Sequence, residues 1–151
     1  MSKLNVVILA AGAGKRMQSA LPKVLHTLAG MPLLMHVINA ARLLSPDKIC
    51  VVVGHGSDKV KQLIGGDDLI WVLQEKQLGT GHALMQALPH MNADGFTLVL
   101  YGDVPLVQIQ TLQQLITVAG EKDCALLSAI IDNPFGYGRV LRDLKNGKVV
   151  A

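Results

Sequence analysis

The chain has 151 residues, of which 50% are hydrophobic and only 3% aromatic, and its formal net charge is +3. This length suits one domain with a buried core, and Lys, Arg, His or Gly interrupts every apolar run before the roughly 18 residues that a transmembrane helix needs. The small charge, which lacks Lys/Arg runs, argues against a nucleic-acid-binding surface.

The first predicted strand covers residues 4–9 and leads directly into a glycine-rich stretch. The N-terminus imitates a secretory signal with its cleavage site, because an apolar run follows Lys3 and leads to the triplet Ala11-Gly12-Ala13. Cleavage there would remove the most strand-like segment, so we interpret it as a strand of a cytoplasmic protein. Cys50 and Cys124 agree, because both lie in apolar strand-like runs without C-x-x-C spacing, which predicts small buried hydrophobes.

Strand-like runs and helical patterns alternate along the rest of the chain. Further strands are predicted at residues 49–53, 69–73, 96–101 and 124–131. Pro32 starts the first predicted helix, Ser57 caps the second before Gly65 and Gly66, the third ends before Pro89, and the fourth ends before Gly120. Their predicted inward positions are Leu34, Val37, Ile38 and Ala41, then Val60, Leu63 and Ile64, then Ala83, Leu84, Ala87 and Leu88, then Ile109, Leu112, Ile116 and Ala119. This alternation predicts the α/β class, with a Rossmann-like, doubly wound and mostly parallel sheet.

The pattern changes after residue 131. Residues 139–151 resemble two short strands about a type I′ turn at Asn146 and Gly147, and the chain stops within the second. We interpret this end as a truncation. Residues 1–151 are then the N-terminal part of one domain, without an internal repeat or an interdomain linker.

The segment after the first predicted strand, A-A-G-A-G-K-R-M, is the first candidate for a ligand site, because open α/β sheets bind ligands beyond the carboxyl ends of their strands. It is not a Walker A loop, since Leu9 and Arg16 occupy the positions of the required Gly and Ser/Thr. It is not a dinucleotide fingerprint either, since Met17 stands at the third glycine position. No Asp or Glu precedes Asp47, so a positive field surrounds the loop and favours a small anion.

Two cations near this loop predict a phosphate ligand. Glycines let backbone N–H groups approach a phosphate chain, while Arg16 and Lys23 can neutralise the charge that develops as a phosphoanhydride breaks. Pro22 fixes the approach of Lys23. The alternative is a generic glycine turn with solvated cations.

The glycine loop together with Pro22 and Lys23 resembles the signature of the sugar-nucleotide pyrophosphorylases, G-x-G-T-R-M followed by P-K. Lys15 stands where that family has Thr, so the loop loses a hydroxyl and gains a charge. Three further segments, VLQEKQLGTGHA, LYGDVPL and PFGYGRV, resemble the base-reading, metal-carrying and sugar-side segments of bacterial N-acetylglucosamine-1-phosphate uridylyltransferases, in the same order along the chain.

This resemblance implies Mg²⁺-dependent transfer of a uridylyl group from UTP to N-acetylglucosamine 1-phosphate, for cell-wall and lipopolysaccharide precursor synthesis. It implies that Arg16 and Lys23 are catalytic and face the phosphates, and that Asp103 binds Mg²⁺. Contacts to the substrates are implied for Leu9, Ala10, Ala11, Gly12, Gly14, Lys23, Gln74, Gln77, Gly79, Thr80, Tyr101 and Gly138. Members of this family also carry a C-terminal β-helix acetyltransferase domain that forms trimers, so a homotrimer is expected only with that domain, and residues 1–151 alone are expected to be inactive.

Other interpretations stay open from the sequence. The chain could be a nucleotidyltransferase for another base or sugar, or a noncatalytic nucleotide-binding module. Gln74 and Gln77 could merely finish a strand and cap a helix, and Asp103 could be a turn former. The five histidines share no metal-ligand spacing and are predicted at the surface or in helix packing, with His82 near the nucleotide loop. Trp71 and Met85 are predicted in the core.

Overall fold

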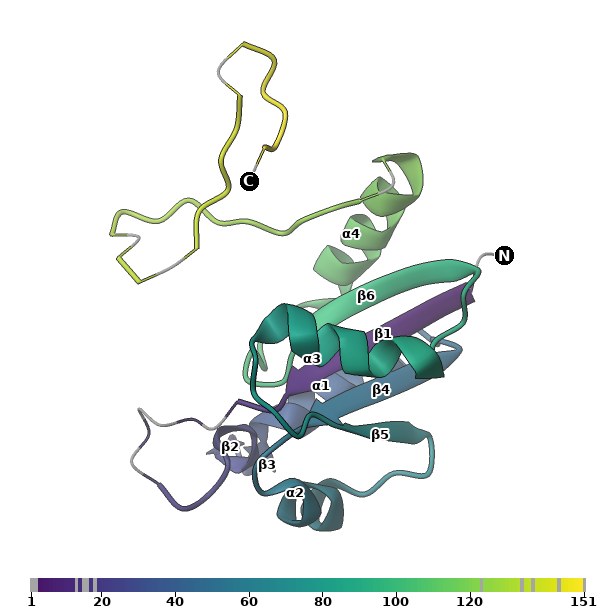
Figure 1. The fold of residues 1–151 in the computed structure, drawn as a ribbon, viewed down its shortest axis with the longest axis vertical. Helices are drawn as coiled ribbons and strands as arrows, with labels where there is room; N and C mark the ends of the chain where they lie inside the picture. The colour runs from purple at the N-terminus through teal and green to yellow at the C-terminus, as the bar shows by residue number, and fades with distance from the viewer. Residues whose placement is uncertain are drawn as a thin grey trace.

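The computed structural model describes residues 3–12, 14, 17, 19–122, 124–133, 135–136, 138–143 and 145–150. Its central feature is a four-stranded, wholly parallel sheet with the strand order β5-β4-β1-β6 (Figure 1). The strands are β1 (Lys3–Ala10), β4 (Lys48–Val53), β5 (Leu69–Leu73) and β6 (Gly95–Tyr101). The four strands predicted within the first 101 residues are therefore confirmed, each to within one residue at either end.

Four helices connect or follow these strands: α1 (Leu33–Arg42), α2 (Ser57–Ile64), α3 (Thr80–Ala87) and α4 (Ile109–Lys122). Shorter elements are the 3-10 turns η2 (Lys23–Leu25) and η3 (Leu88–His90), and a small antiparallel pair of β2 (Thr27–Leu28) and β3 (Met31–Pro32). In the described part of the chain, none of the helices combines the length and the apolar character needed to cross a bilayer.

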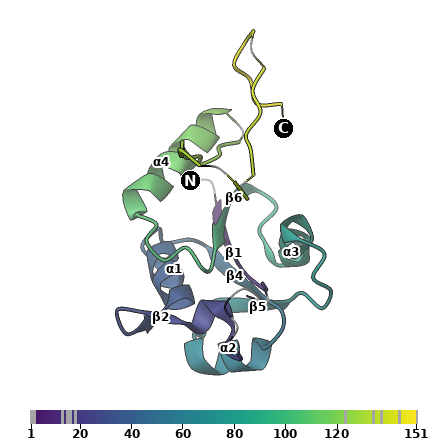
Figure 2. The same cartoon turned by 90° about the vertical axis from the view of Figure 1, so that its left-hand side faces the viewer.

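The sheet is covered on both faces, as the alternating pattern predicts. Successive β1 side chains point to opposite faces, so Val6 and Ile8 pack with α1, α2 and α4, whereas Val7 packs with α3 on the other face. Figure 2 shows this three-layer arrangement nearly edge-on, with α1 and α3 on opposite sides. Buried helix residues on the first face include Leu34, Val37, Ile38, Ala41, Val60, Ile64 and Leu112, and those on the second face are Ala83 and Ala87.

The strand order fixes where a ligand can enter. From β1 the chain moves to β4 and then β5 on one side, and it returns past β1 to form β6 on the other side. The carboxyl ends of β1 and β6 therefore lie side by side where the direction of winding reverses, with Leu9 aligned to Tyr101. In open α/β sheets this switch point is the usual ligand-binding crevice.

Several details of the predicted helices are wrong. Pro32 precedes α1 as its N-cap, and Gly56, at φ 76°, takes that position in α2 instead of Ser57. Leu63 in α2 and Leu88 in the 3-10 turn η3 are both 57% exposed rather than inward. Helix α4 passes Gly120 and ends at Lys122, since glycine weakens a helix but does not stop it.

The predicted strand at residues 124–131 is wrong. In the part of the chain that the structure describes, this segment pairs with no strand, and Leu126, Leu127 and Ile130 are exposed (Figure 1). Its first four residues line an open pocket together with β6. A strand requires a neighbour for its backbone hydrogen bonds, whatever its composition. Cys124 is therefore exposed rather than buried, whereas Cys50 is fully buried as predicted, and burial raises the pKa of its thiol.

The predicted hairpin near the end is present in a different form. Arg142 and Val149 form an antiparallel bridge, so two short extended segments do lie together. The N–H of Asp143 donates to the carbonyl of Lys148, and the Asp143 carbonyl accepts from Gly147. The chain therefore reverses between Asp143 and Lys148, which are five residues apart, rather than in a two-residue type I′ turn.

The predicted core is also corrected at one position. Trp71 is partly buried against the α1 face of the sheet, as predicted. Met85 is 62% exposed on the outer face of α3, because Ala83 and Ala87 occupy the inward positions of that short helix. The small inward residues bring α3 close to the sheet.

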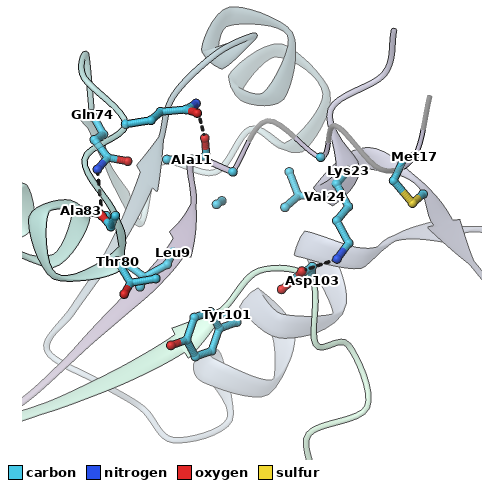
Figure 3. A pocket seen from close by; sticks show the side chains of 15 residues that line it. Leu9, Ala11, Met17, Lys23, Val24, Gln74, Thr80, Ala83, Tyr101 and Asp103 are labelled. Atoms are coloured by element: carbon cyan, nitrogen blue, oxygen red, sulfur yellow. Dashed lines mark hydrogen bonds and ion pairs between the residues drawn. The ribbon is translucent and has the colours of Figure 1, made fainter. Parts of the chain in front are cut away.

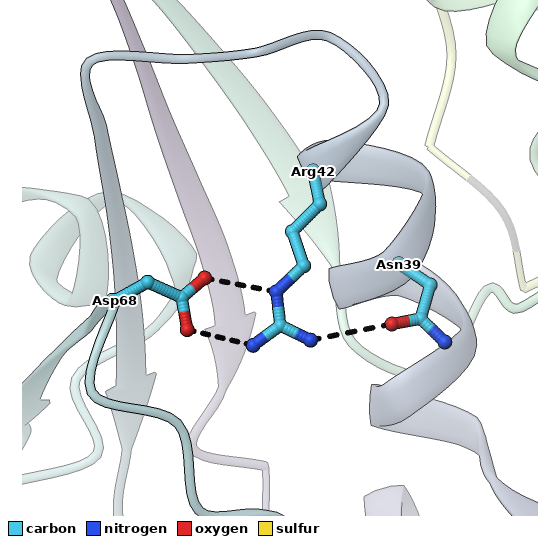
Figure 4. A network of polar contacts seen from close by, with 3 residues as sticks. All are labelled: Asn39, Arg42 and Asp68. Carbon is cyan, nitrogen blue, oxygen red and sulfur yellow. Dashed lines mark hydrogen bonds and ion pairs between the residues drawn. The ribbon is translucent and has the colours of Figure 1, made fainter.

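A bidentate ion pair ties α1 to the segment before β5 (Figure 4). Arg42 donates through Nε to one oxygen of Asp68 at 2.8 Å and through Nη2 to the other at 2.7 Å, and Nη1 donates to Asn39 at 3.3 Å. The hydrogen bonds from Arg42 hold the pKa of the Asp68 carboxyl below its ordinary value. Both side chains are well exposed, so solvent screens the pair.

Replacing Asp68 by asparagine is expected to lower the free energy of unfolding at pH 7 by about 0.2–1 kcal/mol, the usual range for an exposed pair. Because the folded-state pKa is lowered, this stabilisation is present above the unfolded-state value of about 3.9 and is lost as the pH falls through the folded-state pKa. Urea unfolding of the wild type and of Asp68→Asn, at pH 7 and at a pH below the folded-state pKa of Asp68, measures this stabilisation. Asp67→Asn is the control, and an equal loss there would contradict the assignment.

Candidate functional site

A pocket of about 620 Å³ lies at the carboxyl ends of β1 and β6. Segments that follow β1, β5 and β6 line it, together with the first residues of η2 and α3 (Figure 3). The lining residues are Leu9, Ala10, Ala11, Gly12, Gly14, Met17, Lys23, Val24, Gln74, Gln77, Gly79, Thr80, Ala83, Tyr101 and Asp103. The sheet therefore forms a pocket at the switch point where a ligand is expected.

The glycine loop passes directly in front of Lys23. Gly14 has φ +58°, and a Cβ there would stand 2.9 Å from the Cβ of Lys23, so both the backbone conformation and the close approach require glycine. Pro22 precedes η2 with φ −49° and directs Lys23 into the pocket wall. Arg16 and Lys15, which the sequence analysis singled out, lie outside the described residues.

Lys23 and Asp103 form an ion pair across the pocket although 80 residues separate them. Lys23 Nζ lies 2.6 Å from Asp103 Oδ2, and the two side chains are 36% and 32% exposed. The segment that carries Asp103 is fixed to β1, because the N–H of Gly102 donates to the carbonyl of Leu9 at 2.9 Å. The structure therefore brings the predicted phosphate-binding cation and the predicted metal ligand to one point of the pocket.

Two glutamines connect the segment after β5 to the rest of the pocket. Gln77 Nε2 donates to the carbonyl of Ala11 at 2.7 Å, which links this segment to the glycine loop (Figure 3). Gln74 is only 4% exposed, and its Nε2 donates to the carbonyl of Gly79 at 3.2 Å. Gly79 precedes α3 with φ 102°, so the turn between Gln74 and Thr80 depends on glycine.

Gly54→Ala is expected to disturb this link. A Cβ at Gly54 would stand 2.8 Å from the carbonyl oxygen of Ala11 and 3.1 Å from Gln77 Nε2, so both must shift. We expect a loss of about 1–3 kcal/mol in the free energy of unfolding, as for overpacked interiors. Urea unfolding measures it.

Gly120→Ala is the matched control, because a Cβ there meets only Phe96 at an ordinary 3.6 Å. It is expected to change stability by no more than about 1 kcal/mol, in the stabilising direction. Unfolding curves for Gly54→Ala and Gly120→Ala that coincide would contradict the close packing at Gly54.

The sequence of this chain matches the model of the MobA-like NTP transferase domain over residues 6–143. The chain belongs to the MobA-like NTP transferase family. The match covers β4, β5, β6, the part of β1 from Val6 on, the glycine loop and the whole pocket.

Curated relatives of this MobA-like domain include two proteins named "Bifunctional protein GlmU". The one from Nitrosospira multiformis is 58% identical over 151 residues, which are 100% of this chain and 33% of the relative. The one from Nitrosomonas eutropha is 58% identical over 152 residues, again 100% of this chain and 33% of the relative. The chain therefore spans about one third of the length of the curated relatives that it matches.

Solved structures share the fold of this MobA-like domain. Rv0371c from Mycobacterium tuberculosis superposes with a TM-score of 0.71 at 24% identity, over 80% of this chain and 62% of that one. The same protein in complex with manganese gives a TM-score of 0.68 at 23% identity, over 79% of this chain and 60% of that one. A UDP-glucose pyrophosphorylase complexed with UDP-glucose gives 0.66 at 18% identity, over 82% of this chain and 55% of that one. The α/β, mostly parallel architecture expected from the sequence is confirmed.

Most of the predicted site residues of this MobA-like domain line the pocket. Two of them, Arg16 and Gly138, are not among its lining residues. Arg16 lies outside the described residues, and Gly138 belongs to the exposed segment after α4 and is not among the residues that line the pocket. Sequence reasoning missed Met17, Val24 and Ala83, which do line it. All three lie within or next to the motifs already quoted, so adjacency to those motifs was the available signal.

Proposed function

We propose that this chain forms the nucleotide-binding part of a nucleotidyltransferase that transfers a uridylyl group from UTP to N-acetylglucosamine 1-phosphate, releasing pyrophosphate. The observation that carries the proposal is the convergence of the glycine loop, Lys23 and Asp103 on one pocket. Membership of the MobA-like NTP transferase family supports nucleotidyl transfer, and the names of the curated relatives and of the UDP-glucose pyrophosphorylase support a uridine sugar nucleotide.

The proposed binding mode follows the chemistry of the lining residues. The triphosphate lies along the backbone of Gly12 and Gly14, which have no side chains and so let their N–H groups approach it closely. Arg16 and Lys23 face the phosphate oxygens. The base lies toward Gln74 and the turn at Gly79, where an amide and backbone groups can pair with a pyrimidine edge. Further nucleotide contacts are proposed for Leu9, Ala10, Ala11, Gln77 and Thr80, a ribose or sugar contact for Tyr101, and an N-acetyl contact for Gly138.

A Mg²⁺ ion fits the residues at the Lys23 side of this pocket. Mg²⁺ is usually bound through one or two carboxylates together with substrate phosphates and water. Asp103 supplies a partly exposed carboxylate. Among the contacts of the described residues, Lys23 bonds to Oδ2 of this carboxylate and not to Oδ1. The described residues hold no group of three His, Cys, Asp or Glu that could bind a metal alone, so Asp103 would hold the ion jointly with the nucleotide. When bound, the ion neutralises charge on the triphosphate. The manganese complex of the structural neighbour is consistent with a divalent ion.

The reaction needs no covalent enzyme intermediate. A phosphate oxygen of the sugar phosphate forms a bond to the α-phosphorus of UTP while the bond to the bridging α,β-oxygen breaks, and the electron pair leaves with pyrophosphate. The residues of this chain hold the two substrates in line and offset the negative charge on the transferring group. Lys23 is paired with Asp103 in this structure, and we propose that it moves from Asp103 to a phosphate oxygen when the nucleotide binds.

The proposal extends to the setting of the domain. We propose that residues 1–151 correspond to the N-terminal part of the nucleotidyltransferase domain in relatives about three times as long. The remaining substrate contacts, the acetyltransferase domain and the homotrimer would then belong to regions outside this chain. A cytoplasmic location follows from the proposed substrate UTP, which is held inside cells.

The test uses a chimaera in which residues 1–151 replace the matching third of the Nitrosospira multiformis relative. Pyrophosphate release is measured for each of the four ribonucleoside triphosphates and dTTP, paired with several sugar 1-phosphates. We expect the highest kcat/KM for UTP with N-acetylglucosamine 1-phosphate. A higher value for another pair would replace the proposed substrates. Calorimetric UTP binding without metal-dependent turnover would instead favour a noncatalytic nucleotide-binding module.

A further inference from the structure

His82 connects α3 to the buried side chain of Gln74. Its ring nitrogen Nδ1 lies 2.9 Å from Gln74 Nε2, and the same Nε2 lies 3.2 Å from the carbonyl oxygen of Gly79. Gln74 comes directly after β5, and its own backbone N–H donates to the carbonyl of Val53 at 2.8 Å. The Gln74 amide is therefore held at a fixed position by the end of the sheet, the turn and the helix.

These contacts determine which way the amide of Gln74 points. The carbonyl of Gly79 can only accept a hydrogen bond, so the group that faces it must be the NH₂ and not the amide oxygen. The second proton of that NH₂ is directed to His82, so Nδ1 must be the unprotonated nitrogen of the ring and must accept. Both N–H donors of Gln74 are thereby used within the protein.

The other side of the His82 ring faces Gln86. A neutral imidazole that accepts at Nδ1 carries its proton on Nε2. The side-chain amide of Gln86, one helical turn further along α3, lies 3.3 Å from Nε2. The same Gln86 Nε2 lies 3.4 Å from the backbone carbonyl oxygen of His82, which can only accept, so the Gln86 NH₂ faces this side of the ring. The tautomer of His82 therefore follows from the Gln74 and Gly79 contacts alone.

At Gln74 these contacts leave one group for a ligand. With both protons of Gln74 engaged, the group that remains is the amide oxygen, and among the contacts of the described residues no donor is bonded to it. Figure 3 shows this oxygen directed toward the interior of the pocket. A ligand group that faces Gln74 must therefore donate.

We propose that His82 is a positioning residue for base recognition: by accepting from Gln74 it holds the Gln74 amide oxygen toward the pocket and selects pyrimidines that carry an N–H at ring position 3. This inference rests on the proposed function, in which Gln74 faces the base. Uracil has that N–H, whereas neutral cytosine has an acceptor at the same position and meets the oxygen unfavourably. Without His82, the amide loses one of its two anchors and the oxygen is less firmly directed.

The test compares kcat/KM for UTP and for CTP in the chimaera. His82→Leu removes the acceptor, and we expect the UTP/CTP ratio to fall about tenfold, as for loss of one net hydrogen bond. Most of the change is expected in the KM for UTP, with kcat nearly unchanged, because Gln74 faces the base rather than the reacting phosphate. His82→Asn can present Oδ1 near the position of Nδ1, and we expect it to restore the ratio to within about twofold of the wild type.

His90→Leu is the matched control, since His90 is exposed in η3 at the far end of α3. It is expected to leave the UTP/CTP ratio unchanged. A His82→Leu ratio equal to the His90→Leu ratio would overturn the inference. If the unsubstituted chimaera has no activity with UTP, the proposed function itself fails, and the base-selecting role fails with it.

A second measurement does not depend on activity or on the His82→Leu variant. Nitrogen-15 NMR of the 151-residue chain reports which nitrogen of each neutral histidine ring carries the proton, and the spectrum of His82→Asn identifies the His82 signals. We expect the proton on Nε2 of His82. A proton on Nδ1 would overturn the inference even if His82→Leu failed to fold.

Discussion

Replacing Lys23 by alanine in the chimaera is expected to lower kcat about 10²–10³-fold, the usual loss when one preorganised charge contact to a transition state is removed. Lys23 stands at the pocket beside the glycine loop, and its ammonium group is partly screened from water. Fold stability should change by no more than about 1 kcal/mol, because the ion pair with Asp103 is about one-third exposed. Steady-state pyrophosphate release and thermal unfolding measure the two quantities.

Lys59→Ala serves as the control for the Lys23 variant, because Lys59 is exposed on α2 away from the pocket. Its kcat should match that of the wild type. Arg16→Ala is expected to reduce kcat by the same order as Lys23→Ala, about 10²–10³-fold, for the same physical reason. Near-normal rates for both Lys23→Ala and Arg16→Ala would contradict the phosphate assignment.

Asp103→Asn is expected to lower kcat by at least about 10³-fold, since charge stabilisation by a bound metal ion contributes several kcal/mol. Asparagine keeps the shape of the side chain but loses the charge that favours Mg²⁺. Calorimetric titration of Mn²⁺ into the chimaera with a non-hydrolysable UTP analogue should show a matching loss of affinity. Asp58→Asn, on the exposed face of α2, is the control. Unchanged Mn²⁺ affinity in Asp103→Asn would contradict the role of Asp103 as a ligand.

The ion pair makes the Lys23 and Asp103 substitutions interdependent. Each residue is the partner of the other without nucleotide, at 2.6 Å, so removing either one frees the other. Contacting residues of this kind are expected to give non-additive effects. The combined Lys23→Ala and Asp103→Asn variant should therefore lose less activity than the product of the two separate losses.

The sheet could be predicted from the sequence because its strands are continuous apolar runs between helices. β1 and β4 are buried on both faces, which gives Val- and Ile-rich segments without polar alternation, whereas the buried residues of β6, Leu98 and Leu100, lie on one face only. The segment at 124–131 is also apolar, yet it forms no strand in the described structure. Composition predicts which segments favour extended backbone, whereas strand formation also requires a neighbour with free N–H and C=O groups.

Burial on single helix positions was harder to predict. Periodicity identified Ala83 and Ala87 correctly but also suggested Leu63 and Leu88, which are exposed. Leu88 is the first residue of the 3-10 turn η3, which has no buried residue, whereas the pattern had placed Leu88 on the inward face of the preceding helix.

The candidate site was predictable in its parts but not in its contacts. Motifs identified Lys23, Asp103 and Gln77, and strand order explains why their segments meet. The 2.6 Å pair between Lys23 and Asp103 and the 2.7 Å bond from Gln77 to Ala11 join residues 80 and 66 positions apart. Such contacts depend on how the strand ends align, which the sequence alone does not specify.

The most direct test of this account is a crystal structure of the 151-residue chain with a non-hydrolysable UTP analogue and Mn²⁺. The account predicts the triphosphate along Gly12 and Gly14, Lys23 moved from Asp103 to a phosphate oxygen, and Mn²⁺ between Asp103 and the phosphates. A triphosphate bound elsewhere, with the Lys23–Asp103 pair still closed and no metal at Asp103, would contradict it.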